Sequence, residues 1–125
     1  MKKMLFIIFS TFMTASLQAK NVDYEVLKQQ AIEYENSLTE VEKSQLNQSY
    51  AQPLSNSIGF CAQFYQGTSF EIISKVDQNG VMLENWTNTE GTFAECIRMM
   101  FNHRQIQSVR NEEFYAILEF NLTKH

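Results

Sequence analysis

The sequence contains two cysteines, Cys61 and Cys96, and a disulfide between them would constrain the fold more than any other single feature. Cys96 lies in residues 92–105, TFAECIRMMFNHRQ, where apolar residues follow the i, i+3, i+4, i+7, i+8 spacing of one helix stripe. The stripe consists of Phe93, Cys96, Ile97, Met100 and Phe101. Thr92 and Glu95 have the spacing of a capping box at its start. We therefore expect a central helix that packs on a sheet and that a disulfide ties to the segment around Cys61.

Residues 1–19 have the layout of a secretory signal peptide. A positive start at Met1–Lys3 precedes an apolar stretch over Met4–Met13 and a small, polar run that ends at Ala19. An uncleaved anchor helix is the alternative, but the apolar stretch is too short to span a bilayer comfortably. Cleavage after Ala19 would leave residues 20–125 as a single domain without a stable membrane anchor. The short signal with two lysines suggests a periplasmic location.

Export into an oxidising compartment favours a disulfide over two free thiols. A metal pair is disfavoured because the cysteines form no CxxC motif and no histidine cluster accompanies them. The chain has a formal net charge of −4, and removal of the signal peptide would make it more acidic because Lys2 and Lys3 leave with it. An acidic chain argues against nucleic acid and anionic membrane surfaces as partners.

The first half of the chain predicts helices. Residues 22–50 carry an apolar seam that fits either one kinked helix or two helices that meet near Ser37, and Thr39 with Glu42 forms a second capping-box pair. Gln52–Pro53 is expected to end this helical run. Residues 55–66 fit either a strand or a helix, and we favour a helix because Ser55 or Asn56 offers an N-cap and Gly67 follows its end.

The second half predicts strands around the central helix. Residues 68–76 and 81–87 form a hairpin whose Asn79-Gly80 pair favours a type I′ turn, and residues 114–122 alternate cleanly between apolar and other residues. The expected fold is α+β. An N-terminal helix or helix pair precedes β-β-α-β, and a small three-stranded antiparallel sheet packs its apolar face on the helices.

The residue types do not form a recognisable catalytic or metal-binding set. His103 follows the helix stripe and His125 is the last residue, so neither stands beside an expected nucleophile. Glu112-Glu113 lies in a polar stretch with nothing to desolvate it. We therefore expect no enzymatic activity, no metal and no cofactor. The candidates for binding another protein are Trp86, Tyr65, Arg98, Arg104 and Arg110. Trp86 equally fits the edge of a small core, and the three arginines equally fit a solvated surface.

The second half also resembles the C-terminal domain of TonB-like energy-transducer proteins, over about residues 58–122. Val76-Asp77-Gln78-Asn79-Gly80-Val81 is similar to that family's hairpin. Residues 93–100, with the motif A-x-C-I, are similar to its helix, and residues 114–120 are similar to its last strand. The resemblance implies a three-stranded antiparallel α+β domain that pairs with other proteins of the cell envelope, and it carries no catalytic residue.

These observations favour a non-enzymatic periplasmic domain that binds another periplasmic or envelope protein. One form of this hypothesis is an immunity or inhibitor protein against a toxin or hydrolase that acts in the envelope, which the acidity of the chain suits. The alternative is an accessory component of an envelope complex with a TonB-like C-terminal fold that uses an exposed sheet edge for strand addition.

Overall fold

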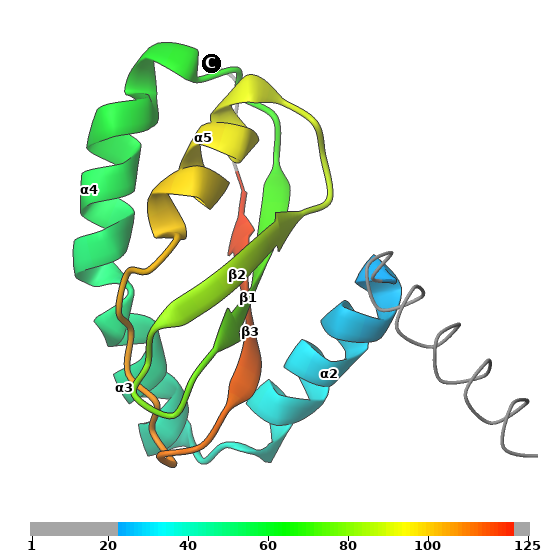
Figure 1. The fold of residues 1–125 in the computed structure, drawn as a ribbon, viewed down its shortest axis with the longest axis vertical. Helices are drawn as coiled ribbons and strands as arrows, with labels where there is room; N and C mark the ends of the chain where they lie inside the picture. The colour runs from blue at the N-terminus through cyan, green and yellow to red at the C-terminus, as the bar shows by residue number, and fades with distance from the viewer. Residues whose placement is uncertain (1–22, 122–125) are drawn as a thin grey trace, which may run out of the picture.

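The computed structural model describes residues 23–121, and the expected signal peptide at residues 1–19 lies outside this range. The elements follow the predicted α+β order (Figure 1). The helices are α2 (Tyr24–Ser37), α3 (Glu40–Ser49), α4 (Ala51–Cys61), a short 3-10 turn η1 (Ala62–Phe64) and α5 (Thr92–Phe101). The strands are β1 (Phe70–Val76), β2 (Met82–Thr87) and β3 (Phe114–Phe120).

The three strands form an antiparallel sheet in the order β2-β1-β3, with β1 in the centre. Helix α2 lies on one side of the sheet, over β3, whereas α5 and α4 lie on the other (Figure 1). We expected one covered face, and the structure has helices over both. The reason lies in β1, where Ile72 and Ile73 point to opposite faces and are both buried, so each face needs a cover.

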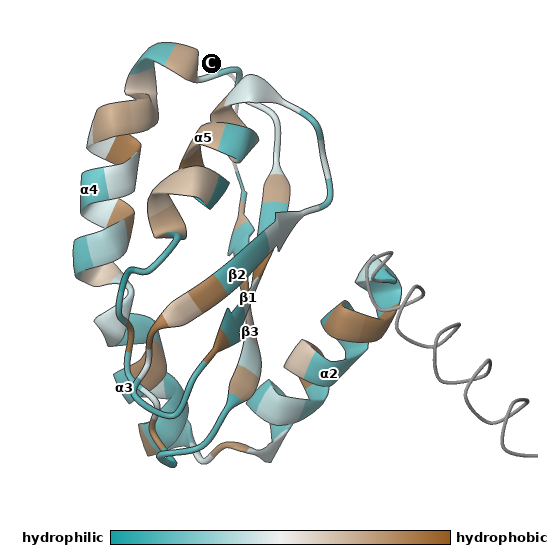
Figure 2. Cartoon of the chain, in the orientation of Figure 1, coloured by the Kyte–Doolittle hydropathy of each residue, from teal (hydrophilic) through white to brown (hydrophobic). Residues whose placement is uncertain are grey.

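The main core lies between the sheet and α5. Phe70, Ile72 and Val76 of β1 alternate along the strand and pack in one cluster with Phe93, Ile97 and Phe101 of α5. The apolar colours along the strands and α5 in Figure 2 follow this layer, and α2 shows polar colours over much of its surface. The predicted stripe of the central helix is therefore confirmed, with Cys96 and Met100 only partly buried at its flank.

The disulfide between Cys61 and Cys96 is confirmed, with sulfurs 2.04 Å apart and Cα atoms 5.8 Å apart. It joins the last residue of α4 to the middle of α5. Helix α4 packs mainly on α5 and makes few contacts with the sheet. The disulfide therefore fixes an outer helix to the helix that covers the core.

The N-terminal helical region is two helices, and their break is the one expected near Ser37. Leu38 adopts an extended conformation, and the Thr39–Glu42 capping box is present in both directions, with hydrogen bonds of 3.1 Å and 2.9 Å. The prediction for Pro53 is wrong. Helix α4 begins at Ala51, and Pro53 lies in its first turn, where the missing N–H has no helical partner to lose. The helical interpretation of residues 55–61 is confirmed, but Ser55 and Asn56 lie inside the helix.

The capping box predicted at Thr92 and Glu95 is absent. Thr92 is the first helical residue of α5 and Gly91 is the N-cap, so the Thr92 hydroxyl stands one position too late to cap and makes no such bond. Helix α5 ends at Phe101, before the end of the stretch 92–105 in which we expected the central helix, because Asn102 leaves the helical region and His103 has a positive φ of 65°.

The hairpin turn is not type I′, because only Gly80 in residues 77–80 has a positive φ, of 88°. The carbonyl of Asp77 accepts from the N–H of Gly80 at 3.0 Å, and its carboxylate accepts from the N–H groups of Asn79 and Val81, each at 2.9 Å. The aspartate thus holds a three-residue loop with a glycine in the left-handed position. None of the helices within residues 23–121 is long and apolar enough to cross a membrane.

Candidate functional site

The outer edge of β2 is paired at its start and open further along. The N–H of Met82 donates to the carbonyl of Arg104, and the carbonyl of Met82 accepts from the N–H of His103, both at 2.9 Å. Val81, just before the strand, also forms an antiparallel bridge with Gln105. Between residues 23 and 121, no segment pairs with the rest of this edge. The segment after α5 therefore covers only the first part of β2.

The hydrogen bonds of β1 show which backbone groups of β2 face outward. The N–H of Asp77 donates across the hairpin at 3.0 Å, and the N–H of Glu71 donates to the side-chain oxygen of Asn88, just beyond β2, at 3.0 Å. The odd-numbered residues of β1 therefore bond toward β2, because backbone groups alternate sides along a strand. Asn85 lies opposite Ser74 and Thr87 lies opposite Ile72, both even-numbered residues of β1. The N–H and C=O groups of Asn85 and Thr87 therefore point away from β1, in the plane of the sheet, toward its outer edge.

Two adjoining hollows, of about 430 Å³ and 380 Å³, lie at this open edge and share Tyr24, Thr87 and Glu95. One rim is the first turn of α2 and the other is α5, and β2 ends between these two helices (Figure 1). We call this region the β2-edge groove. Its lining residues are Tyr24, Glu25, Asn85, Trp86, Thr87, Asn88, Thr89, Glu90, Glu95 and Arg98.

The α2 rim is held by a buried carboxylate. Glu71 accepts a hydrogen bond from the Tyr24 hydroxyl at 2.8 Å and pairs with the Lys28 ammonium at 3.1 Å. A buried carboxylate needs such partners, because its charge is costly to remove from water. Burial, with the hydrogen bond to Glu71, raises the pKa of Tyr24, and the hydrogen bond to Glu71 raises the pKa of Lys28. The start of α2 is thus fixed to the central strand.

The α5 rim carries an ion pair that is open to solvent. The Arg98 guanidinium donates from Nε and Nη2 to one oxygen of Glu95, at 3.0 Å and 2.9 Å. The Glu95 side chain is 41% exposed, so the pair adds little to stability. Trp86 lies partly exposed on the same face as Ile73, with its ring 6.3 Å from the ring of Tyr115. The groove therefore combines an aromatic ring, outward-pointing backbone groups and charged rims.

The structure brings two of the predicted binding residues together and separates the other three. Trp86 and Arg98 line the same hollow. Tyr65 packs edge-on against Phe93, with ring centroids 5.5 Å apart. Arg104 donates to the carbonyl of Met100 at 3.3 Å, beyond the end of α5.

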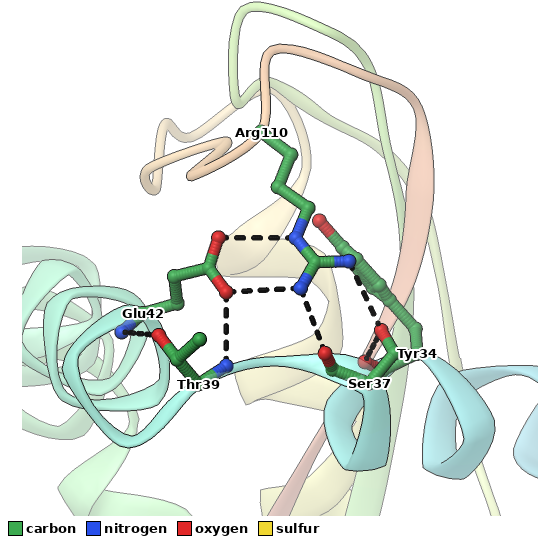
Figure 3. A network of polar contacts seen from close by, with 5 residues as sticks. All are labelled: Tyr34, Ser37, Thr39, Glu42 and Arg110. Atoms are coloured by element: carbon green, nitrogen blue, oxygen red, sulfur yellow. Dashed lines mark hydrogen bonds and ion pairs between the residues drawn. The ribbon is translucent and has the colours of Figure 1, made fainter.

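Arg110 instead joins the loop before β3 to the junction of α2 and α3 (Figure 3). Its guanidinium donates to both carboxylate oxygens of Glu42, at 3.0 Å and 2.9 Å, and to the carbonyl of Ser37 at 2.7 Å. The Arg110 hydrogen bonds, followed by that from the Thr39 backbone N–H, lower the pKa of Glu42 to about 2. The contacts of Arg110 therefore hold the fold together.

Sequence reasoning missed the other groove residues. Tyr24 belongs to the apolar seam of the first helix, and Glu95 has the spacing of a capping-box residue at the start of the central helix. Neither residue therefore stands out in the sequence as a binding candidate. No local pattern places residue 24 beside residue 95.

A larger hollow lies elsewhere, at the hairpin turn and the loop after α5. It has a volume of about 760 Å³, and its lining side chains are amides, serines and one isoleucine, with no titratable group. Within the described part of the chain, no three His, Cys, Asp or Glu side chains gather as metal ligands would. The lining of this hollow and the distribution of His, Cys, Asp and Glu side chains therefore provide no set of groups for acid–base chemistry among the described residues.

Comparisons with protein families, curated proteins and solved structures found no match to this chain.

Proposed function

We propose that this protein is a non-enzymatic binding protein of the bacterial envelope, which acts by holding another periplasmic or envelope protein. The observation that carries the proposal is the outer edge of β2, where the backbone groups of Asn85 and Thr87 point outward beside Trp86 and pair with no segment of residues 23–121. Thr87 is partly exposed, and Asn85 is 5% exposed. An open edge is a template for strand pairing and is normally blunted or covered. A tryptophan at such a site supplies the large contact area that interface hot spots use.

The specific form that we favour is an immunity or inhibitor protein that neutralises an envelope-acting toxin or hydrolase. Its support is the net negative charge together with a small fold braced by a disulfide. A tight complex needs a surface that changes little on binding, and the fixed α2 rim meets that need.

The second candidate is an accessory component of an envelope complex with a TonB-like C-terminal fold. The order β1, β2, α5, β3 and the antiparallel sheet favour it, because both are what the resemblance implies. Its partner would be a membrane-complex subunit instead of a soluble toxin.

A capture experiment separates these candidates. Tagged residues 20–125, with the disulfide formed, are incubated with envelope extract from the source organism, and captured proteins are identified and quantified by mass spectrometry. A single stoichiometric soluble partner supports the inhibitor form, and enrichment of membrane-complex subunits supports the accessory form. Capture of neither would refute the proposal.

The same capture with Trp86→Ala tests the site. The loss should be at least tenfold if the ring is a hot spot, which corresponds to about 1.4 kcal/mol. Met99→Ala is the matched control, because Met99 is an exposed apolar residue of α5 that does not line the groove.

A further inference from the structure

The proposed binding function leaves open what kind of segment the β2-edge groove receives. We propose that the groove takes an extended segment of a partner protein that carries lysine or arginine side chains and that pairs as an added strand with Asn85 and Thr87. This inference rests on the proposed function and deepens it.

The chain already shows strand pairing on this edge. Residues 103–105 pair with the start of β2 through Met82 and the neighbouring Val81–Gln105 bridge. An incoming segment would continue that pairing along the remainder of β2. Thr87, which is partly exposed, offers one outward donor and one outward acceptor for this purpose. Asn85 directs the same two groups outward, although the residue as a whole is only 5% exposed. Backbone pairing of this kind gives affinity without specifying a sequence.

The charge of the groove selects the segment. Three glutamates, Glu25, Glu90 and Glu95, line it against one arginine, Arg98, and that arginine is already paired with Glu95. Glu84 adds an exposed carboxylate on β2 itself. Successive side chains of an added strand point to opposite faces of the sheet, so lysine or arginine side chains on the α2 face would meet Glu25 and Glu84, and those on the α5 face would meet Glu95. An acidic segment would be repelled, and like charge also suppresses wrong partners.

The same charges argue against a second copy of this chain as the occupant. Two copies joined edge to edge along β2 would bring their glutamate rims together, and among residues 23–121 no basic side chain apart from Arg98 lines the groove to offset them. Charged side chains on an edge strand are a common device against self-pairing. The geometry therefore points to a different protein with a basic strand.

Synthetic peptides test the inference directly. The probe is a blocked peptide of about eight alternating lysine and valine residues, and its counterpart replaces lysine with glutamate. Trp86 is the only tryptophan of the chain, so its fluorescence reports binding at the groove. We expect saturable binding of the lysine peptide that weakens as salt is added, and none of the glutamate peptide. Equal binding of both peptides would overturn the inference, as would no binding of the lysine peptide up to about 1 mM.

Two variants locate the contact. Thr87→Pro removes the outward N–H, which an edge strand tolerates, and should abolish binding, whereas Thr87→Val keeps the N–H and should retain it. Glu25→Gln with Glu90→Gln should weaken the lysine peptide about fivefold at low salt. The same change at Glu112 and Glu113, which do not line the groove, should have little effect. Binding that survives Thr87→Pro in a folded protein would refute strand addition.

Other outcomes separate this inference from the proposed function. If envelope extract yields a stoichiometric partner whose capture does not depend on Thr87→Pro, the groove inference fails and the binding function stands. If the lysine peptide binds but no partner is captured, the binding function fails and the groove chemistry stands. Self-association through β2 in sedimentation equilibrium, abolished by Thr87→Pro, would show the occupant to be a second copy and overturn the inference.

Discussion

Reduction of the Cys61–Cys96 disulfide should destabilise the fold by an amount that its loop length sets. The two cysteines are 35 residues apart. Loop-closure entropy for a loop of this size contributes about 3.8 kcal/mol to the free energy of unfolding. A domain of this size has a total stability of about 5–15 kcal/mol, so the reduced protein should remain folded but with a much smaller margin.

Urea unfolding of the oxidised and reduced protein measures this directly. With a denaturant slope of about 1.5 kcal/mol per molar, the midpoint should fall by about 2.5 M on reduction. Cys61→Ala with Cys96→Ala is the control, because its midpoint should not respond to the reductant. A fall of less than about 0.5 M would refute the loop-closure argument.

Hydrogen exchange adds a regional test of the same argument. Helix α4 is held chiefly by α5, so its amides should lose protection on reduction before those of β1 do. Equal loss of protection in both elements would show that the disulfide supports the whole fold evenly.

Two further substitutions test the loops and caps. Glu42→Gln should lower the melting temperature most at neutral pH. The ion pair with Arg110 stabilises the fold above the ordinary carboxyl pKa of 4.5, and this stabilisation is lost as the pH falls toward 2. A difference in melting temperature from the parent protein that stays constant down to pH 2 would contradict this. Gly80→Ala should cost at least about 2 kcal/mol by chemical denaturation, because Gly80 has a φ of 88° and a Cβ there would lie 1.9 Å from the carbonyl oxygen of Ile106. Gly59→Ala is its control, since a Cβ there meets nothing within 4 Å and the change should stabilise helix α4.

The parts of the fold that were predictable have their signals within a few residues. The alternation of apolar residues from Phe114 to Phe120 predicts a strand because side chains of a strand alternate between two faces. The apolar stripe from Phe93 to Phe101 predicts a helix because it follows the repeat of 3.6 residues per turn. The Thr39–Glu42 box is equally local. The disulfide was predictable because the chain has only two cysteines and its expected export favours their oxidation.

The failures arose where several local solutions compete. Thr92 and Glu95 have capping spacing, but the helix begins one residue too early for the hydroxyl to cap. Pro53 predicts the end of a helix, but it lies in the first turn of α4, where a proline is tolerated. In the hairpin, the carboxylate of Asp77 binds two backbone N–H groups and replaces the turn that Asn-Gly favours.

The groove could not be predicted because its rims are distant in the sequence. Trp86 and Arg98 stood out by residue type alone, whereas their shared hollow depends on α2 and α5 covering opposite faces of one sheet. The burial of Ile73 on the second face is the one sequence-readable hint, since an apolar run through β1 implies two covers.

The placement of α2 over β3 has a consequence for the order in which the chain can fold. The first described helix rests on the last described strand, and Arg110 binds Ser37, a residue 73 positions earlier. The hairpin and α5 are neighbours along the chain and can associate early, whereas α2 makes most of its contacts with β3 and gains them only once β3 is in place. Such long-range closure slows folding, so the folding rate should respond to substitutions in β1 and α5 more than to those in α2.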